Sequence, residues 1–524
     1  MRSKIRVKEI HGKEYWYEDI PYYDKEKGQI RHHSKYLGKN IDGKPVKVRN
    51  VLDGDSKSIL FSSNSIISFG YGELIPVLQI IRDLHIDRYL GKLLNKTQMN
   101  MVLTLSINRV VRPTAMHILK TWYEGSFLSH LYPDLPLSSQ NLSNFLANLG
   151  DSSVPSMFME KLLKKLGTKS TLLYDITSLS SYSKLIDLLE YGHNRDNINL
   201  PQLNLSMIID KNYGIPVMYD IYPGSIVDVS TLKNTIKKVK GYGVKKFTLV
   251  MDRGFFSQGN LEELLNDKRL LFIIPATLIW KNVKELMSSA QRDIEYPKHL
   301  QMYNKNPIFV KPVKLTFDDF NVNGYCYYDQ QSEHNERNSF YTRLYDVKKN
   351  IEEKSIQPWR KADEVFKERA KNMANYYSWK VEDQHFKITI KKNAVTQRIN
   401  RLGKFIIFYR GEYDWMDCLT IYKEKDLIEK GFKRFKRDLE AIPLNAQKES
   451  TTRGFLFICF LGLMIEMKLV NQMKETKLLK EYTLEKLLLE LEKIKKMKLP
   501  NGEIITTEIT KRQREILDKL NLCA

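Results

Sequence analysis

The chain has 524 residues, of which 42% are hydrophobic, so it is long and apolar enough to build two to four domains with real cores. Its 84 Lys and Arg residues outnumber 62 Asp and Glu residues and give a formal net charge of +22. The four cysteines form no CxxC pair, which argues against a disulfide framework or a zinc site and fits a reducing, cytoplasmic setting.

The ends and the apolar stretches of the chain point away from a membrane. The N-terminal residues Met-Arg-Ser-Lys-Ile-Arg-Val-Lys contain no apolar segment, so no signal peptide is expected. The most apolar stretch, 454–465, is too short to span a bilayer and is predicted to be a buried helix. The basic residues are spread along the whole chain, which favours a large surface that follows a polyanion. A Lys-rich solvated surface without a partner is the alternative.

Residues 1–60 are expected to form a β-rich basic module. Aromatic and basic residues alternate there around Gly12, Gly28 and Gly38, a pattern typical of short strands in hairpins. Such a module can either contact nucleic acid or serve as a small β-cap with a solvated face.

Residues 70–167 show helical periodicity. Apolar side chains recur at i, i+3, i+4 and i+7, and Ser138 and Ser139 are suitable N-caps for the second of two clear helices. The apolar faces are Leu74, Val77, Leu78 and Ile81, and then Leu142, Phe145, Leu146 and Leu149. The region is either a DNA reader of the helix-turn-helix kind or a helical scaffold.

Residues 168–276 change to a pattern of alternating strands and helices. A hairpin is expected at Asp210–Gly214, because Asn and Gly favour tight turns, and a later helix has Ser257 as its candidate N-cap. The predicted elements are strands 171–176, 203–210 and 215–222, a helix over 229–240, strand 246–252, the helix after Ser257, and strand 269–275. This β-β-β-α-β-α-β order is that of an RNase H-like core, in which the first and fourth strands lie side by side.

The remaining residues are expected to complete that core around an insertion. Residues 277–415 carry Tyr- and Phe-rich runs and a Lys/Glu-rich stretch at 347–371, which indicates a mainly β insertion with a charged connector. Residues 416–475 would hold the second part of the core, and 476–524 the C-terminal helices, the last opened by a capping box at Thr510. The predicted fold class is mixed α/β.

Three carboxylates occupy the positions that a nuclease site on this core requires. Asp175 ends the apolar run 171–175, Asp252 ends 247–252, and Glu429 lies on a predicted helix. Buried apolar strands rarely end in carboxylates without a reason, because an unpaired buried charge is costly. A shared site for two Mg²⁺ ions is such a reason, since Mg²⁺ prefers oxygen ligands and metal pairs support phosphodiester cleavage.

The helix with Glu429 shows two faces. Ile428, Phe432, Phe435 and Leu439 are spaced to pack on the sheet. Tyr422, Lys425, Glu429 and Lys436 form a separate polar stripe that can face metal ions and DNA together. A solvated charged face with i,i+4 ion pairs is the alternative for this segment alone.

Together these motifs resemble the DDE transposases of the insertion-sequence-four superfamily. Tyr422, Lys425, Glu429 and Lys436 stand at the spacing Y-x2-R-x3-E-x6-K, with Lys425 in place of the usual Arg. Lys keeps the charge but loses the bidentate fork for phosphate. The other similar segments are Tyr174-Asp175-Ile-Thr177-Ser178, Asp252-Arg253-Gly254-Phe255, Gly192-His-Asn-Arg195-Asp196, Gly214-Ile-Pro216 and Pro223-Gly224-Ser-Ile-Val-Asp228.

The resemblance implies a metal-dependent transposase that cuts DNA at the ends of an insertion sequence and transfers the freed 3′-OH to target DNA. It implies Asp175, Asp252 and Glu429 as catalytic and metal-binding residues, with two Mg²⁺ ions that Mn²⁺ can replace. Tyr422, Lys425, Lys436, Arg253 and Arg195 are the expected DNA contacts, and terminal inverted repeats and a homodimeric synaptic complex the expected partners. A metal-dependent nuclease on the same core and an inactive DNA-binding relic are the alternatives.

Overall fold

The structure, a computed structural model, consists of two compact units. One contains Met1–Ile67 with Lys498–Glu503, and the other contains Ser68–Met497 with Ile504–Ala524. The structure describes residues 3–10, 13–24, 29–41, 43–46, 66–165, 170–183, 185–192, 200–226, 228–278, 280–317, 320–357, 359–440 and 446–523.

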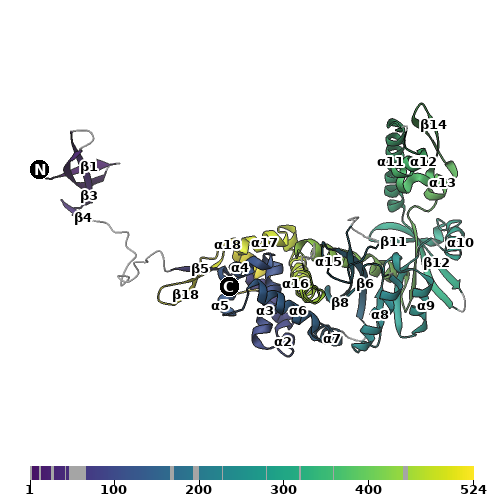
Figure 1. The fold of residues 1–524 in the computed structure, drawn as a ribbon, viewed down its shortest axis with the longest axis horizontal. Helices are drawn as coiled ribbons and strands as arrows, with labels where there is room; N and C mark the ends of the chain where they lie inside the picture. Colours follow the sequence, from purple (N-terminus) through teal and green to yellow (C-terminus); the bar gives the residue numbers. More distant parts are fainter. Residues whose placement is uncertain are drawn as a thin grey trace. The chain divides into compact units, whose positions relative to one another are not determined.

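The first unit is a four-stranded antiparallel sheet. Its strands are β1 (Lys4–Ile10), β2 (Lys13–Asp24), β3 (Gln29–Ile41) and β4 (Lys44–Val46), which pair in chain order (Figure 1). Apolar side chains such as Ile5 and Ile30 are 60% and 52% exposed. These strands lie within the residues for which a β-rich module is expected.

The second unit begins with a helical region. Ser138 caps α6 as predicted, because its side chain accepts a hydrogen bond from the Asn141 backbone N–H. The helices are α1 (Leu74–Asp83), α2 (Ile86–Leu90), α3 (Lys96–Val111), the 3-10 turn η2 (Met116–Ile118), α4 (Leu119–Gly125), α5 (Leu128–Leu131), α6 (Ser139–Asp151) and α7 (Val154–Lys165).

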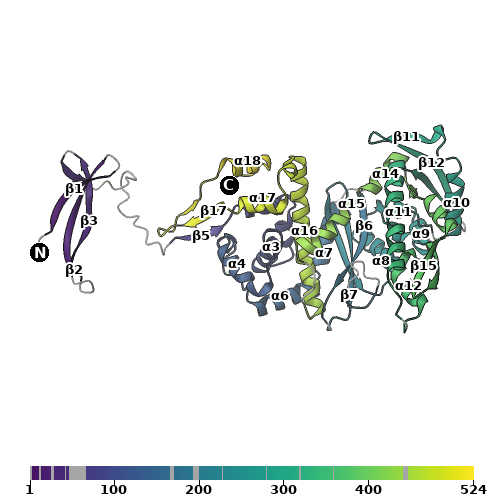
Figure 2. The ribbon, with the colours of Figure 1, turned by 90° about the horizontal axis from the view of Figure 1, so that it is seen from above.

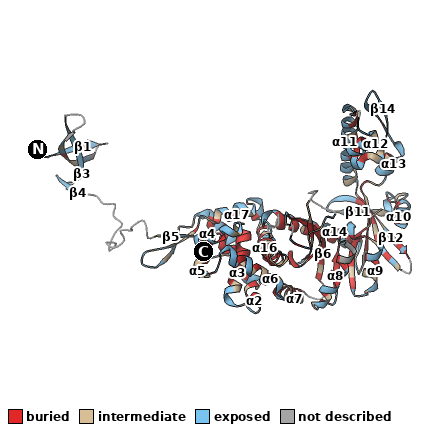
Figure 3. Cartoon of the chain, in the orientation of Figure 1, coloured by how far each residue is buried: buried red, intermediate tan, exposed pale blue. Residues whose placement is uncertain are grey.

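Helix α16 (Glu449–Glu475) joins this helical region to the sheet, and Figure 2 shows it running between them. It is long and apolar enough to cross a membrane, but 78% of its most apolar window is buried inside the protein (Figure 3). Glycines allow the close approach to α6: a Cβ on Gly454 would lie 2.0 Å from the Leu146 carbonyl oxygen, and one on Gly150 would lie 1.9 Å from that of Ser450. The predicted buried helix is therefore the middle of a longer core helix.

A nine-stranded mixed sheet forms the rest of the core, in the order β11-β12-β13-β16-β10-β9-β6-β7-β8. Within it, β9 is parallel to both β6 and β10, whereas β6-β7 and β7-β8 are antiparallel. This arrangement is consistent with the RNase H-like core predicted from the sequence. The elements are β6 (Ser170–Ser180), β7 (Gln202–Asp210), β8 (Ile215–Pro223), α8 (Asp228–Gly241), β9 (Phe247–Val250), the 3-10 turn η3 (Arg253–Phe255), α9 (Gln258–Asn266) and β10 (Leu270–Pro275).

The predicted hairpin and cap of this core are present. Gly214 has a φ of +64° at the end of the β7–β8 turn, and its N–H donates to the Asp210 carbonyl oxygen at 2.8 Å. The Ser257 side chain accepts a hydrogen bond from the Asn260 N–H and caps α9.

The insertion divides into two parts with different partners. Three of its strands and β16 (Lys404–Arg410) extend the core sheet, and β16 returns antiparallel to β10. Residues 330–399 instead gather around their own apolar cluster, which includes Phe340, Ile351 and Phe366 (Figure 1). The sheet-extending elements are α10 (Lys281–Gln291), the 3-10 turn η4 (Pro297–His299), β11 (Leu300–Tyr303), β12 (Asn306–Phe317) and β13 (Phe320–Tyr328).

The part with its own cluster is largely helical, which differs from the expected charged connector at 347–371. Long runs of Lys and Glu support helices through i,i+4 ion pairs such as Lys348–Glu352 and Lys367–Asp363, and the few apolar residues among them fill one face. Its elements are α11 (Gln330–Glu353), α12 (Ala362–Ala370), the 3-10 turn η5 (Lys371–Tyr376), β14 (Tyr377–Glu382), β15 (His385–Ile390) and α13 (Lys392–Ile399).

The C-terminal part of the second unit is mainly helical. Thr510 forms the predicted capping box with Gln513 at the start of the last helix. The elements are α14 (Trp415–Lys423), α15 (Asp426–Lys433), the π-helical turn η6 (Arg434–Asp438), α16, the 3-10 turn η7 (Leu478–Lys480), α17 (Leu484–Leu491), β17 (Lys495–Lys498), β18 (Ile504–Thr506) and α18 (Lys511–Lys519); β17 and β18 form a small sheet with β5 (Ile67–Gly70).

Candidate active site

Two of the three predicted carboxylates lie just beyond the parallel pairing of β6 with β9. Asp252 follows the end of β9 as predicted, but Asp175 does not end its strand, because β6 continues to Ser180 alongside β7. Strands β6 and β9 pair in parallel, with Leu173 opposite Val250 as their last partners. Asp175 and Asp252 each follow two positions later, and side chains two positions apart point to the same face of a strand. The parallel register therefore brings together two residues that are 77 positions apart in the sequence.

A buried aromatic contact joins the two aspartate segments. The ring of Tyr174 packs on that of Phe255, with centroids 5.0 Å apart, and neither side chain is exposed to solvent. The turn that carries Phe255 starts at Asp252, whose side chain accepts a hydrogen bond from the Arg253 N–H at 2.7 Å. Phe255 thus holds the turn after Asp252 against the strand that contains Asp175. The sequence places Phe255 in the segment Asp252-Arg253-Gly254-Phe255 but does not by itself show this packing role.

Glu429 lies on a shorter helix than the sequence predicted. The expected single helix is interrupted: α14 ends at Lys423, α15 covers Asp426–Lys433, and a π-helical turn follows. At the interruption the backbone bonds are of the i→i+3 kind, as in Leu427 N–H to the Glu424 carbonyl oxygen, so the chain bends without leaving helical dihedral angles. The predicted buried face is confirmed, since Ile428, Phe432, Phe435 and Leu439 are all at most 7% exposed.

A glycine sets the distance between this helix and the sheet. A Cβ on Gly431 would lie 3.0 Å from Cδ1 of Ile209 in β7, closer than nearly all real contacts of this kind. The absence of a side chain at Gly431 therefore lets α15 lie close to β7 and keeps Glu429, two residues earlier, near the strand ends.

Lys425 connects two of the carboxylates. Its Nζ lies 3.1 Å from Oδ1 of Asp252 and 2.8 Å from Oε1 of Glu429, while its own side chain is only 8% exposed. Burial lowers the pKa of Lys425, but the Glu429 hydrogen bond and the charges of Asp252 and Asp175 outweigh this and raise it above its ordinary value. The ammonium group therefore occupies the position of a cation among the three acidic residues.

The carboxylates do not form a finished metal site in this arrangement. Among the described residues, no group of three or more His, Cys, Asp or Glu side chains is placed to hold a metal ion. Two distances to one ammonium nitrogen limit the separation of the Asp252 and Glu429 oxygens to about 6 Å. The acidic oxygens suit Mg²⁺, and the Lys425 ammonium group lies between two of them.

The predicted DNA contacts differ in exposure. Arg253 is exposed next to Asp252, whereas Tyr422 is half-buried, and burial together with the Asp252 charge raises the pKa of its hydroxyl. Lys436 is only 9% exposed, in the π-helical turn. Arg195 lies outside the described residues. The expected polar stripe is therefore not one solvent-facing row, because the helix interruption and the π-turn change the angles between its members.

Other acidic residues near the core have local partners. Asp210 accepts a hydrogen bond from the Tyr213 N–H at 2.8 Å in the β7–β8 turn, and Asp220 forms an ion pair with Lys238. Sequence reasoning missed two buried glutamates, Glu73 and Glu466. Glu73 directly precedes α1 and Glu466 directly follows the apolar stretch 454–465, and neither position by itself indicates a buried carboxylate.

The similarity of the chain to known proteins points to one family. No curated protein matches the chain. A solved structure of the piggyBac transposase synaptic complex with hairpin DNA is similar at 9% identity and a TM-score of 0.36, covering 76% of this chain and 70% of that chain. The Drosophila P element transposase strand transfer complex gives 12% identity and a TM-score of 0.18, covering 76% and 87%. Residues 167–465, which include all three carboxylates and more than half of the sequence, match the transposase DDE domain. The chain belongs to the transposase DDE domain family.

Proposed function

We propose that this transposase cuts DNA at the ends of an insertion sequence and joins the freed 3′-OH to target DNA, as a member of the insertion-sequence-four superfamily. The observation that carries the proposal is the contact of Lys425 with both Asp252 and Glu429, next to strand β6, which contains Asp175. The spacing of Tyr422, Lys425, Glu429 and Lys436 supports the choice of superfamily.

Asp175, Asp252 and Glu429 are the residues that would hold divalent metal ions, Mg²⁺ in the first place. A cationic group already lies between Asp252 and Glu429, and the available donors are carboxylate oxygens, which is the ligand type that Mg²⁺ prefers. When bound, a metal pair supplies charge stabilisation for in-line displacement at phosphorus and a more acidic bound water.

The protein's own residues prepare the site for this chemistry. Lys425 holds the two carboxylates together without a metal. If a bound metal ion neutralises the carboxylates instead, the Lys425 ammonium group becomes available to a phosphate oxygen. Phe255 and Tyr174 fix the turn of Asp252 against β6. Arg253, exposed next to Asp252, is the DNA contact that this arrangement favours most.

The proposed partners follow from the reaction and the charge. A formal net charge of +22 suits a surface that binds the phosphate backbone of terminal inverted repeats and target DNA. Two DNA ends require two active sites, so we propose a homodimer in the synaptic complex. We place the protein in the prokaryotic cytoplasm, with the nucleoid DNA it acts on.

The experiment uses DNA that spans both flanks of the gene, incubated with the protein and Mg²⁺ or Mn²⁺. We expect nicking at a defined position and joining of the 3′ end to a second DNA. Asp252→Asn should abolish both, whereas Asp220→Asn, which changes a carboxylate paired to Lys238 away from the site, should not.

Each other outcome selects an alternative. Cleavage without joining would favour a metal-dependent nuclease. Binding without cleavage by the unchanged protein would favour an inactive relic, and Lys425→Arg would then be the variant to test for recovered activity. Cleavage that survives Asp252→Asn would refute the proposed site.

A further inference from the structure

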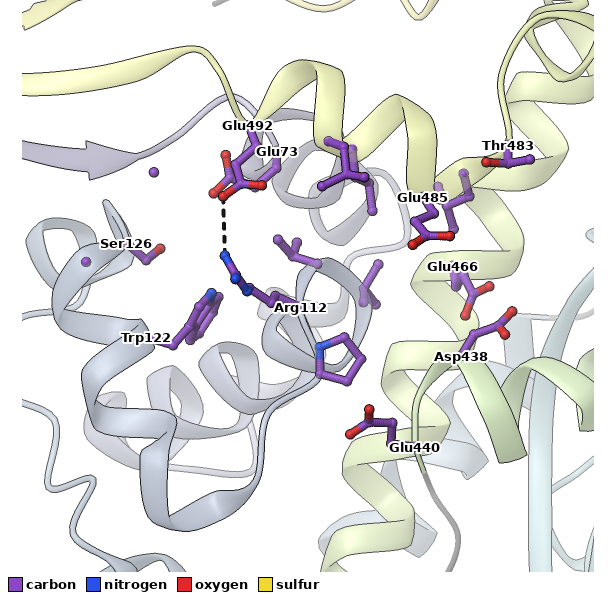
Figure 4. Close-up of a pocket in the computed structure, with 18 of the residues that line it drawn as sticks. Glu73, Arg112, Trp122, Ser126, Asp438, Glu440, Glu466, Thr483, Glu485 and Glu492 are labelled. Atoms are coloured by element: carbon purple, nitrogen blue, oxygen red, sulfur yellow. Dashed lines mark hydrogen bonds and ion pairs between the residues drawn. The ribbon is translucent and has the colours of Figure 1, made fainter.

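A cavity of about 820 Å³ lies in the helical region, and none of the three carboxylates of the candidate active site lines it (Figure 4). Its walls come from the end of α3, from α4, α16 and α17, and from the segment 434–440. Cavities of this size commonly take small molecules.

The lining of this cavity is acidic, although the chain as a whole is basic. Among the residues that the structure describes, three cationic side chains line it, those of Arg112, Arg434 and Lys495. Six carboxylates face them: Glu73, Asp438, Glu440, Glu466, Glu485 and Glu492. Such a lining repels the phosphate backbone and attracts cations, so the cavity is not an extension of a DNA-binding surface.

Two of these carboxylates are buried and incompletely paired. Glu73 is 5% exposed and Glu466 is 2% exposed, and within the described part of the chain the Oε2 atom of each has no hydrogen-bond partner. Burial raises the pKa of each carboxyl to about 7. A buried carboxylate oxygen without a partner is costly, so both glutamates are suited to a cationic ligand.

The cations of the lining do not complete the pairing. Arg434 bonds the other oxygen of Glu466 and lowers its pKa, whereas burial and the nearby Asp438 carboxyl, through its charge and a side-chain hydrogen bond, raise it. Arg112 and Lys495 lie 3.4 and 3.9 Å from Glu492, so both cations at this end are already paired with that carboxylate. Their charges lower the pKa of Glu73 and that of Glu492 raises it, but neither cation contacts Oε2 of Glu73. Each buried glutamate thus has a second carboxylate as its neighbour.

These two carboxylate pairs lie at separate ends of the cavity. Figure 4 shows Glu73 and Glu492 together at one end and Glu466 and Asp438 together at the other, with Glu485 and several carbon-only side chains drawn between them. The apolar lining includes Val111, Leu484 and Leu488. A ligand that matches this arrangement carries a positive charge at each end and an apolar chain in the middle.

We propose that this cavity is a binding site for an aliphatic diamine or polyamine, with one ammonium group at Glu73 and Glu492 and another at Glu466 and Asp438. Methylene groups between the ammonium groups would contact the apolar walls. A bare divalent metal ion fits less well, because it would satisfy one end and leave the other unpaired.

The test is a calorimetric titration of the full chain, free of DNA, with 1,4-diaminobutane and with spermidine at pH 8, where both carboxyls are mainly ionised. We expect saturable binding of one diamine per chain and much weaker binding of n-butylamine, which has one charge. The double variant Glu73→Gln with Glu466→Gln should bind at least about tenfold more weakly, because each change removes a charged partner. Glu475→Gln, an exposed carboxylate in the same helix as Glu466, is the matched control and should bind like the unchanged protein.

A second variant guards against a folding defect in the double variant. A Cβ on Gly125 in the cavity lining meets nothing within 4 Å, so Gly125→Lys can begin its side chain there without a clash and carry a tethered ammonium group at the cavity. We expect it to fold and to bind 1,4-diaminobutane at least about tenfold more weakly. The proposal is overturned if the unchanged protein shows no saturable diamine binding, if the double variant or Gly125→Lys binds as tightly as the unchanged protein, or if Mg²⁺ binds there and diamines do not displace it.

Discussion

Replacing Lys425 by Met tests whether its ammonium group stands where a metal ion would bind. Met keeps much of the side-chain volume but removes the charge that contacts Asp252 and Glu429 at 3.1 and 2.8 Å. The two carboxylate oxygens are then left at most about 6 Å apart without a cation. At that largest separation, Coulomb's law gives a repulsion of about 0.7 kcal/mol with the dielectric constant of water and about 2.8 kcal/mol with an effective value of 20. Because Glu429 is 58% exposed, we expect a loss near the lower end, about 1 kcal/mol.

The assay measures the free energy of unfolding by urea denaturation, with and without Mg²⁺. Lys425→Met should be less stable without metal, should recover in Mg²⁺, and should bind Mg²⁺ more tightly than the unchanged protein, since no ammonium group competes. Lys430→Met removes an exposed ion pair with Asp426 on the same helix and should change stability by less than about 0.5 kcal/mol. The reasoning is refuted if Lys425→Met binds Mg²⁺ no more tightly than the unchanged protein.

Three further predictions concern packing, pH and salt. Gly454→Ala should lower the melting temperature strongly, because its Cβ would meet the Leu146 carbonyl oxygen at 2.0 Å, whereas Gly125→Ala, with open space around it, should leave it unchanged or raise it. The pKa of the Glu466 carboxyl is about 7 in the folded protein against an ordinary 4.5, so the folded state binds this proton more tightly than the unfolded state. The free energy of unfolding should therefore fall as pH rises from about 4.5 to 7, by at most about 3 kcal/mol. Glu466→Gln should flatten that part of a pH series of denaturation curves; an unchanged slope would contradict the assignment. DNA affinity, measured by fluorescence anisotropy, should fall roughly a thousandfold between about 50 and 200 mM salt if several phosphates are contacted, and a flat dependence would exclude an extended phosphate-binding surface.

The strands of the core could be predicted from the sequence because each is a short apolar run bounded by turn residues. The pairing of β6 with β9 followed from the order of elements, and with it the meeting of Asp175 and Asp252. Local side-chain chemistry also gave the caps at Ser138, Ser257 and Thr510.

The parts that could not be predicted depend on contacts between distant residues. Helical periodicity continues through Lys425, so the local sequence gives no sign of the interruption between α14 and α15. At this interruption Lys425 is buried against two carboxylates. Strands β11, β12 and β13 read as a separate β domain because their pairing with the core sheet is made through β16, far along the chain. The burial of Glu466 likewise depends on helices that are remote in sequence.

The way residues 330–399 are attached has a consequence for how the sequence of this chain can evolve. They leave the sheet after Tyr328 and return at Lys404, and these two residues are opposite each other on the neighbouring strands β13 and β16. The whole helical part is thus, in topological terms, an enlarged hairpin loop. Its length and sequence can vary, or a short turn can replace it, while the strands on either side stay paired. Because α14 and α15 follow β16 directly, the position of Glu429 is set by the sheet and is independent of how much chain was inserted before it.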